Sequence, residues 1–210
     1  ASTLSRGNME MMDGAEFYDY YKSFQNVEAV NFPRWNEDLR NSNFDWFKLA
    51  KKTGSTQDYN VTLNGGNEKM QSMFTMGYFK EEGAVKGYDL SRYSTRIKVV
   101  YKPYEWLTIK PNLSGSRTTD TDRQYSVGAM YSMLPWDNPF DENGNPVPNQ
   151  YEGWVNSKGS NYLYDLSKGH YGSSCSYDLA GGFDFDLQIM PWLTFSSVNN
   201  YSDYTSQSHG

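Results

Sequence analysis

The sequence predicts an all-β chain of long antiparallel strands joined alternately by tight turns and long loops. Aromatic residues make up 17% of the 210 residues, while the apolar and aromatic residues together reach only 37%. This composition is unlike that of a helical bundle. The mean hydropathy is −0.80, and the sequence has no run of the ~20 consecutive apolar residues that a membrane helix needs. From residue 56 onward, apolar residues alternate with polar ones, which is the period of a strand.

Charge and cysteine content exclude several functions. The net charge of −6 gives no electrostatic basis for binding nucleic acid, so no nucleic-acid partner is expected. The single cysteine, Cys175, cannot form an internal disulfide, and the sequence has no zinc, metal or cofactor motif, so no cofactor is expected.

The first 55 residues predict short helices within a structured loop. Asp13 and Glu16 form a capping-box pattern that opens a helix through Phe24. Asn43 is expected to cap a second helix, with Gly54 just beyond its end.

Strands follow from the alternation. The sequence predicts strands over 56–63, 69–80 and 92–102, with a tight turn over residues 65–68 (GGNE) between the first two. A turn at Pro103-Tyr104 leads into a strand over 106–114. The last strands, 177–189 and a weaker one from 192, flank a turn at Met190-Pro191.

The order of the connections points to one architecture. Tight turns at one end and long loops at the other are typical of a transmembrane β-barrel, and the loop over 118–176 is the longest, with a short helix over 120–134. Tyr93 and Tyr101 bracket an apolar face, while the opposite face carries charges that suit a wet lumen. The fold class is therefore a segment of a large antiparallel transmembrane β-barrel with long extracellular loops containing short helices.

Alternation alone is equally compatible with a half-exposed sheet of a soluble protein. The candidate membrane-interface aromatics are Tyr78, Tyr93, Tyr101, Trp106, Tyr177 and Trp192.

An ordered set of motifs resembles the early barrel of the SusC/RagA family of TonB-dependent outer-membrane transporters. The main one is residues 57–69 (QDYNVTLNGGNEK), followed by 77–78 (GY) and 81–87 (EEGAVKG). Supporting matches are 43–47 (NFDWF), 52–54 (KTG), 92–96 (RYSTR), 105–107 (EWL), 112–116 (NLSGS) and 141–146 (DENGNP).

The resemblance implies a barrel of about 22 strands around a plug, in the cell outer membrane. It implies a SusD-like surface lipoprotein as partner, energy from the TonB complex through a plug and TonB box that this chain lacks, and outer-membrane lipid around the barrel. The substrate is expected to be an oligosaccharide or a peptide. Both chain ends are expected to be internal to a longer protein. Residues 1–55 and 118–176 would be extracellular loops, and 56–117 and 177–210 barrel strands.

The long loop is where we expect a ligand to be met, because aromatic faces stack on sugar rings and Asp or Asn side chains bind hydroxyls. The alternative is that its aromatic residues form the loop's own small core. The candidate substrate-binding residues are Tyr125, Trp136, Asp137, Asn138, Asp141 and Trp154.

No catalytic motif is present, so the protein is not expected to be an enzyme. The two histidines lie in no metal or triad pattern, and the Asp/Asn-rich run over 137–145 lacks the spacing of a calcium loop. Two other hypotheses stay open: a soluble glycan-binding β-domain with the alternating apolar face as its core, and a glycan-cleaving enzyme with two facing carboxylates.

Overall fold

The computed structural model describes residues 2–3, 11–23, 35–121, 127–148, 154–156, 161–169 and 172–209. The chain divides into two compact units, each treated by itself below. The loop unit comprises Ala1–Gly54, Gly83–Tyr88 and Arg123–Tyr171, and the sheet unit comprises Ser55–Glu82, Asp89–Asp122 and Gly172–Gly210.

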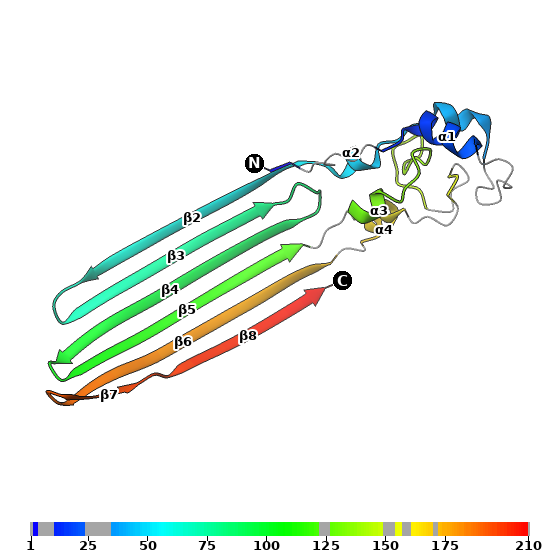
Figure 1. The fold of residues 1–210 in the computed structure, drawn as a ribbon. Helices are drawn as coiled ribbons and strands as arrows, with labels where there is room; N and C mark the ends of the chain where they lie inside the picture. Colours follow the sequence, from blue (N-terminus) through cyan, green and yellow to red (C-terminus); the bar gives the residue numbers. More distant parts are fainter. Residues whose placement is uncertain are drawn as a thin grey trace. The chain divides into compact units, whose positions relative to one another are not determined.

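The sheet unit is an open antiparallel sheet in which each strand from β2 to β6 pairs with the next along the chain, and β8 pairs with β6 (Figure 1). Its strands are β2 (Thr53–Gly66), β3 (Met70–Glu82), β4 (Asp89–Tyr104), β5 (Leu107–Thr121), β6 (Ser173–Met190), β7 (Leu193–Ser197) and β8 (Asn200–His209). A short strand, β1 (Ser2–Thr3), pairs with Thr53 and Gly54 at the start of β2. The mostly β, antiparallel fold predicted from the alternation is confirmed.

β7 and β8 continue one row of the sheet. Both pair with β6, β7 next to its end and β8 along its first half, and Phe185 with Ser197 follows the same register as Gly182 with Asn200. Asn199 bridges the interruption, because its backbone oxygen accepts from the Phe183 backbone N–H at 2.9 Å. The weak alternation predicted for this last strand therefore corresponds to a break in the strand while the pairing register is kept.

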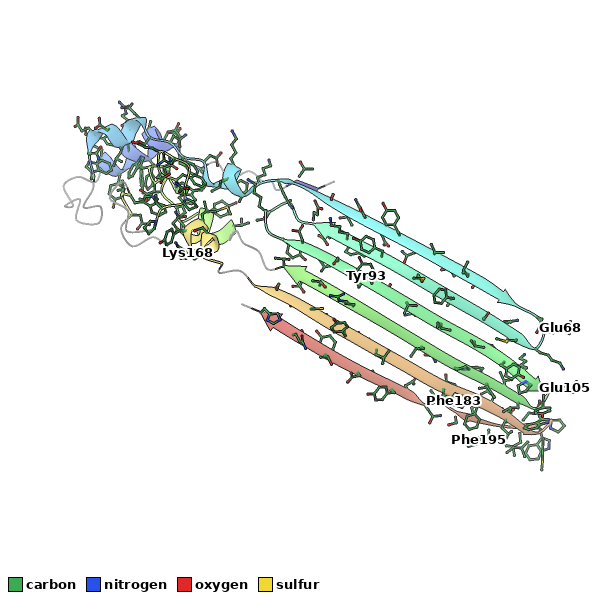
Figure 2. All side chains as sticks on the ribbon, turned by 180° about the vertical axis from the view of Figure 1, so that it is seen from behind. Glu68, Tyr93, Glu105, Lys168, Phe183 and Phe195 are labelled. Carbon is green, nitrogen blue, oxygen red and sulfur yellow. The ribbon has the colours of Figure 1, made fainter. Side chains whose placement is uncertain are left out.

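The three tight connections lie at one end of the sheet (Figure 1). Figure 2 shows Glu68 and Glu105, which belong to two of them, at that same end. The first turn falls at residues 67–69, because Gly65 and Gly66 are the last residues of β2, so its predicted start was two residues early. Gly66 must be glycine, because a Cβ there would lie 2.2 Å from the Met70 carbonyl oxygen. The other two turns fall at Glu105-Trp106 and Pro191-Trp192, so the predicted positions at Pro103-Tyr104 and Met190-Pro191 were one to two residues early.

The strands at the opposite end run further than their side chains predict. β5 continues to Thr121 and β6 begins at Ser173, with Asp120 paired to Ser174. The predicted helix over 120–134 is wrong in its first residues, because residues 120–121 belong to β5. Backbone pairing does not depend on apolar side chains, so their polar character did not predict a strand. Within the described residues that helix is limited to α3 (Val127–Met130).

Among its described residues, the loop unit contains helices at the three places where the sequence predicts them: α1 (Gly14–Lys22), α2 (Trp46–Ala50) and α3. The 3₁₀ helix η2 (Glu37–Asn41) and α4 (Tyr162–Ser167) were not predicted. The predicted capping box of α1 is confirmed, since Asp13 accepts from the Glu16 N–H and Glu16 accepts from the Asp13 N–H. The last turn of the predicted helix, at Phe24, lies outside the described residues.

The cap predicted for the second helix was wrong. Asp45, not Asn43, caps α2 by accepting from the Lys48 N–H at 2.9 Å. The Asn43 side chain instead accepts from the Gly14 N–H at 3.2 Å and so ties α2 to α1. Gly14 must be glycine for this approach, because a Cβ there would lie 1.8 Å from the Ser42 carbonyl oxygen.

Two apolar clusters form the core of the loop unit. The first joins residues of α2 and α3 to distant loop residues: Trp46, Phe47, Ala50, Val85, Met130, Val147 and Trp154. The second joins α1 and η2 to the same long loop: Tyr18, Leu39, Leu134, Trp136 and Val155. In the described part of the chain, no helix is both long enough and apolar enough to cross a membrane.

Candidate functional site

One face of the sheet unit is apolar and exposed. Ile97 and Phe183 are 39% and 50% exposed, and Val99 and Phe185 beside them are only partly buried. No residue described by the structure forms a second layer over them. The soluble β-domain hypothesis needs this face as a core, and the described residues do not supply one. A contiguous apolar surface of this kind marks contact with another apolar phase or partner.

An aromatic row crosses this face near the end that carries the long connections. Tyr59, Tyr78, Tyr93, Arg117 and Tyr177 are register partners across β2 to β6. The Tyr78 and Tyr93 rings lie 4.9 Å apart, and the Arg117 guanidinium lies 5.7 Å from the Tyr177 ring centre. Such a row is what the interface belt of a membrane barrel looks like.

A second set of aromatics lies toward the tight turns. Tyr101 stands eight positions from Tyr93 in β4, and Tyr104 stacks on Trp106 with ring centres 5.1 Å apart. Trp192, in the last turn, is 78% exposed. Eight residues at about 3.3 Å each span about 26 Å along a strand and about 20 Å at a 40° tilt, close to the ~25 Å apolar band of membrane barrels.

The other face of the sheet is polar and charged. Lys110 donates to Asp186 at 2.5 Å, and the Ser196 hydroxyl donates to the same carboxylate at 2.7 Å. Lys98 is in register with Asn112, so Lys98 and Lys110 share this polar face without being direct register partners.

Two of the predicted ligand-binding aromatics are buried in the loop unit. Trp136 is 4% exposed and donates from Nε1 to the Gly14 carbonyl at 2.8 Å. Trp154 is 1% exposed and donates from Nε1 to the Asn138 carbonyl at 2.6 Å. Both rings also contact other rings: Trp154 meets Trp46 in an edge-to-face arrangement, and Trp136 meets Phe17 in a tilted one. This is the arrangement that the alternative interpretation, a small core within the loop, requires.

Asp137 is also a structural residue in this geometry. Its side chain accepts from the backbone N–H groups of Val155 at 2.6 Å and Asn156 at 3.1 Å. Because Asp137 is 1% exposed, these two buried bonds hold residues 154–156 against the rest of the loop.

Two predicted residues remain accessible. Asn138 is exposed and accepts from the Phe140 N–H, and Asp141 is half-buried in a turn. Asp141 accepts from the Asn145 backbone at 2.8 Å and from the Asn145 side chain at 3.2 Å. These bonds, with further ones from Asn143 and Gly144, hold the pKa of the Asp141 carboxyl below its ordinary value. Tyr125 lies outside the described residues.

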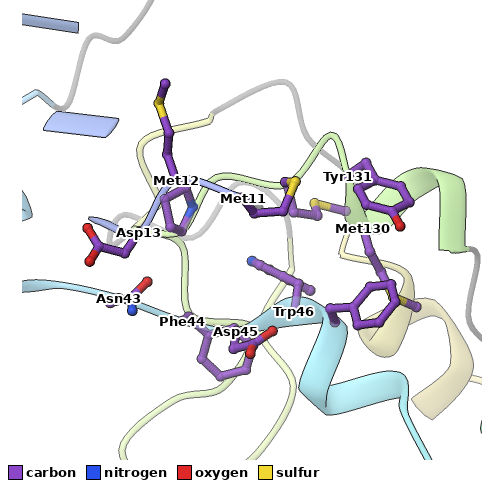
Figure 3. Close-up of a pocket in the computed structure, with 12 residues that line it drawn as sticks. Met11, Met12, Asp13, Asn43, Phe44, Asp45, Trp46, Met130 and Tyr131 are labelled. Atoms are coloured by element: carbon purple, nitrogen blue, oxygen red, sulfur yellow. The ribbon is translucent and has the colours of Figure 1, made fainter. Parts of the chain in front are cut away.

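The structure adds a pocket that sequence patterns did not reveal. It has a volume of about 120 Å³ and lies among the segment before α1, the start of α2, and α3 (Figure 3). The lining residues are Met11, Met12, Asp13, Asn43, Phe44, Asp45, Trp46, Phe47, Met130, Tyr131, Met133 and Pro135. No motif could have identified it, because its walls come from three segments separated by about 30 and 80 residues of chain.

Comparison with solved structures gives the fold a counterpart. A chain in the structure of the RagAB peptide importer in its "closed-closed" state matches 98% of this chain and 27% of that chain, with a TM-score of 0.72 and 21% identity. A chain in a structure of the RagAB peptide transporter matches 92% of this chain and 22% of that chain, with a TM-score of 0.66 and 22% identity. No family model and no curated protein matches the sequence.

The chain therefore has the fold of part of a transporter chain: an open antiparallel sheet with one apolar face, joined to helix-containing loops. It spans about a quarter of the length of the matching chains. The resemblance to SusC/RagA transporters that the motifs predict is confirmed as a likeness of fold to the RagAB importer.

Proposed function

We propose that this chain is a barrel segment of a TonB-dependent importer of the outer membrane, which takes up oligosaccharides or peptides together with a SusD-like surface lipoprotein. The observation that carries the proposal is the exposed apolar face bracketed by aromatic residues. Leaving one large apolar side chain in water costs about 1.5–3 kcal/mol, and this face presents many of them across β2 to β6. Hydrocarbon removes that cost without a second protein layer.

Strand length supports the same assignment. The strands β2 to β6 have 13 to 18 residues, whereas a tilted strand needs about 9–11 to cross a bilayer. The surplus would extend beyond the membrane at the end with the long connections, where the polar residues of β5 and β6 pair.

The sheet edges define what else the barrel needs. Among the described residues, β2 from Ser55 to Gly66 pairs only with β3, and β8 pairs only with β6. An unpaired edge in hydrocarbon costs several kcal/mol for each unsatisfied backbone group, so we propose that further strands close the barrel on both sides.

The loop unit would then face the outside, where ligand and lipoprotein lid meet. Asn138 and Asp141 are the predicted residues with accessible polar groups, and we propose that they contact the ligand or the lid. Trp136, Asp137 and Trp154 would act indirectly by fixing the shape of the loop. No covalent chemistry is involved: the outer loops and lid capture the ligand, and energy delivered through the plug moves it inward.

Fractionation of cells that express the full-length gene product tests the membrane assignment. We expect the protein in the outer-membrane fraction, released by detergent and retained after a high-salt wash. A product found in the soluble fraction would contradict the proposal.

Uptake and partnership need separate measurements. Deleting TonB should abolish uptake of the substrate while surface binding of that substrate remains. Affinity purification in detergent should recover a SusD-like lipoprotein, and import that persists without TonB would overturn the energised mechanism.

A further inference from the structure

The polar face of the sheet unit holds a groove that crosses four neighbouring strands. Its lining comes from two residues of β3, three of β4, three of β5 and one of β6, which lie side by side in Figure 1. The groove has a volume of about 370 Å³, and pockets that hold whole small ligands occupy about 300–1,000 Å³. The groove is therefore large enough for a small ligand rather than for one side chain.

Small polar side chains line the middle of the groove. Ser116 of β5 is the register partner of Ser94 on one side and of Asp178 on the other, and all three line the groove. Among the described residues, no hydrogen-bond partner holds the hydroxyl group of Ser94 or of Ser116. Short side chains let the backbone of a ligand lie close to the sheet, where these hydroxyl groups can pair with its amide groups.

Opposite charges stand on the two sides of the groove. Arg96 lines it from β4 and Asp178 lines it from β6, and both side chains are exposed. Arg96 pairs in register with Ser114, and Asp178 pairs with Ser116, so two strand spacings of about 4.8 Å separate β4 from β6. Within the part of the chain that the structure describes, neither side chain has a hydrogen-bond or ion-pair partner. One positive and one negative charge, about 10 Å apart across the sheet, thus face the same groove.

A ligand that carries both kinds of charge complements this arrangement. A short peptide with free ends has a positive amino group at one end and a negative carboxylate at the other, and three extended residues of about 3.3–3.6 Å each span about 10 Å. A guanidinium group binds a carboxylate through two parallel hydrogen bonds, and an aspartate accepts from an ammonium group. A neutral oligosaccharide offers no charge to either side chain, and no aromatic ring on which a sugar could stack is among the described residues that line the groove.

We propose that this groove binds a short peptide by its two ends, with the carboxylate at Arg96 and the amino group at Asp178. The inference deepens the proposed import function, because it selects peptides over oligosaccharides as the substrate. It rests on that function for the closed barrel in which the polar face lines the interior. Since the groove contacts the ends and the backbone of the peptide, it accepts peptides of many sequences.

The test is calorimetric titration of the full-length protein in detergent with trialanine. Trialanine with free ends should bind about tenfold more tightly than trialanine that is both acetylated and amidated, because the doubly capped peptide carries no charge. This difference should shrink as salt is raised, and peptides capped at one end only should have intermediate affinity. Maltotriose serves as the oligosaccharide probe and should not compete.

Two substitutions assign each end of the peptide to one charge. Arg96→Gln should weaken binding of free trialanine about threefold and should not weaken binding of the amidated peptide, which has no carboxylate. Asp178→Asn should weaken binding of free trialanine about threefold and should not weaken binding of the acetylated peptide, which has no ammonium group. A change in the structure of the sheet would instead weaken binding of all four peptides alike.

Lys102→Gln and Asp58→Asn are the matched controls. Both residues are exposed and lie outside the groove, Lys102 six positions after Arg96 in β4 and Asp58 in β2, four strands from Asp178. Each control therefore lies about 20 Å from the charge that it matches, beyond the screening length of about 8 Å at physiological salt. Both variants should bind free trialanine with unchanged affinity.

Equal affinity for free and doubly capped trialanine, competition by maltotriose, or an equal loss for free and amidated peptide in Arg96→Gln would overturn the inference. So would variants at Arg96 and Asp178 that keep every affinity but lower the midpoint of denaturant unfolding, because these charges would then pair with another part of the full-length protein. Fractionation of the same preparations reports on the proposed function independently. An outer-membrane protein that fails the peptide test loses only this inference, whereas a soluble protein loses the proposed function whatever it binds.

Discussion

The two units of this chain treat large apolar side chains in opposite ways. In the loop unit, Trp46 and Trp154 are 3% and 1% exposed and lie in a core. In the sheet unit, Leu63 and Phe195 are 62% and 52% exposed, and Figure 2 shows Phe183 and Phe195 on neighbouring strands of that sheet. Large apolar side chains are thus buried in one unit and exposed in the other.

The difference indicates two surroundings. A unit that buries its tryptophans and satisfies their N–H groups is organised as proteins in water are. In the proposed function, the sheet, which sorts apolar and charged residues to opposite faces and leaves the apolar face uncovered, contacts hydrocarbon on one side. Substitutions test this difference, because their cost in unfolding free energy depends on whether water, protein or lipid surrounds the residue.

The largest effect is expected from Trp154→Ala. Removing a buried tryptophan leaves a cavity and should destabilise the loop unit by about 3–5 kcal/mol. Hydrogen exchange in the full-length protein should show faster exchange around 127–156 with little change in the strands. Trp106→Ala, at a half-exposed tryptophan of a turn, is the matched control, and an equal loss at both sites would contradict the division into buried and displayed aromatics.

Ile97→Arg should cause the second-largest loss of stability. Ile97 lies midway between Tyr93 and Tyr101 on the apolar face, where an arginine in hydrocarbon costs about 2–4 kcal/mol. Denaturant unfolding from lipid vesicles measures this cost. Ser116→Arg, whose register partners on the polar face are Ser94 and Asp178, should be close to neutral. If Ile97→Arg cost no more than Ser116→Arg, the apolar face would not be in lipid.

Asp137→Asn tests the polar part of the loop core. The amide group can accept only one of the two N–H groups that the carboxylate accepts, so one buried donor is left unsatisfied, at about 1–3 kcal/mol. Local stability by hydrogen exchange or limited proteolysis is the measurement. Asp38→Asn, at an exposed acid of the same unit, should stay within about 0.5 kcal/mol.

The smallest effect concerns pH. The pKa of Asp141 is lowered from its ordinary value of 3.8, mainly by the hydrogen bonds from Asn145. A lowered pKa in the folded state means that the carboxylate stabilises the turn at neutral pH, and that this is lost only as pH falls below 3.8 through the lowered pKa. Titration by carbon NMR should give a midpoint below that of a free aspartate, and Asn145→Ala should raise it. An unchanged midpoint in that variant would exclude the Asn145 side chain as a cause and leave the backbone N–H of residue 145, which alanine keeps.

Sequence patterns predicted the strands well because each strand's side chains follow a local period of two. Tyr93 and Tyr101 fall on one face of β4 for that reason alone. Strand ends were less predictable: Thr121 and Ser173 are polar, yet the backbone ladder continues through them. The turn near Tyr104 falls two residues later than predicted, because Pro103, a residue type that favours turns, lies inside β4.

The loop residues were harder to interpret. Trp136 and Asp137 have the chemistry of a ligand site, and only their contacts with Gly14 and Val155 reveal what holds them. These partners lie 122 and 18 positions away in the chain. The pocket of the loop unit could not be predicted for the same reason, since Met11 and Met133 belong to no sequence motif and become neighbours only in the fold.

The sequence by itself determined the strand periodicity, the apolar and charged faces, and the capping box of α1, because each depends on residues within one turn or one strand. Only the tertiary structure decided which aromatic residues are buried and which are displayed, where the turns fall, and that a pocket exists beside Asp13 and Asp45. Those features depend on contacts between distant segments, and the burial of a side chain is a property of everything that surrounds it.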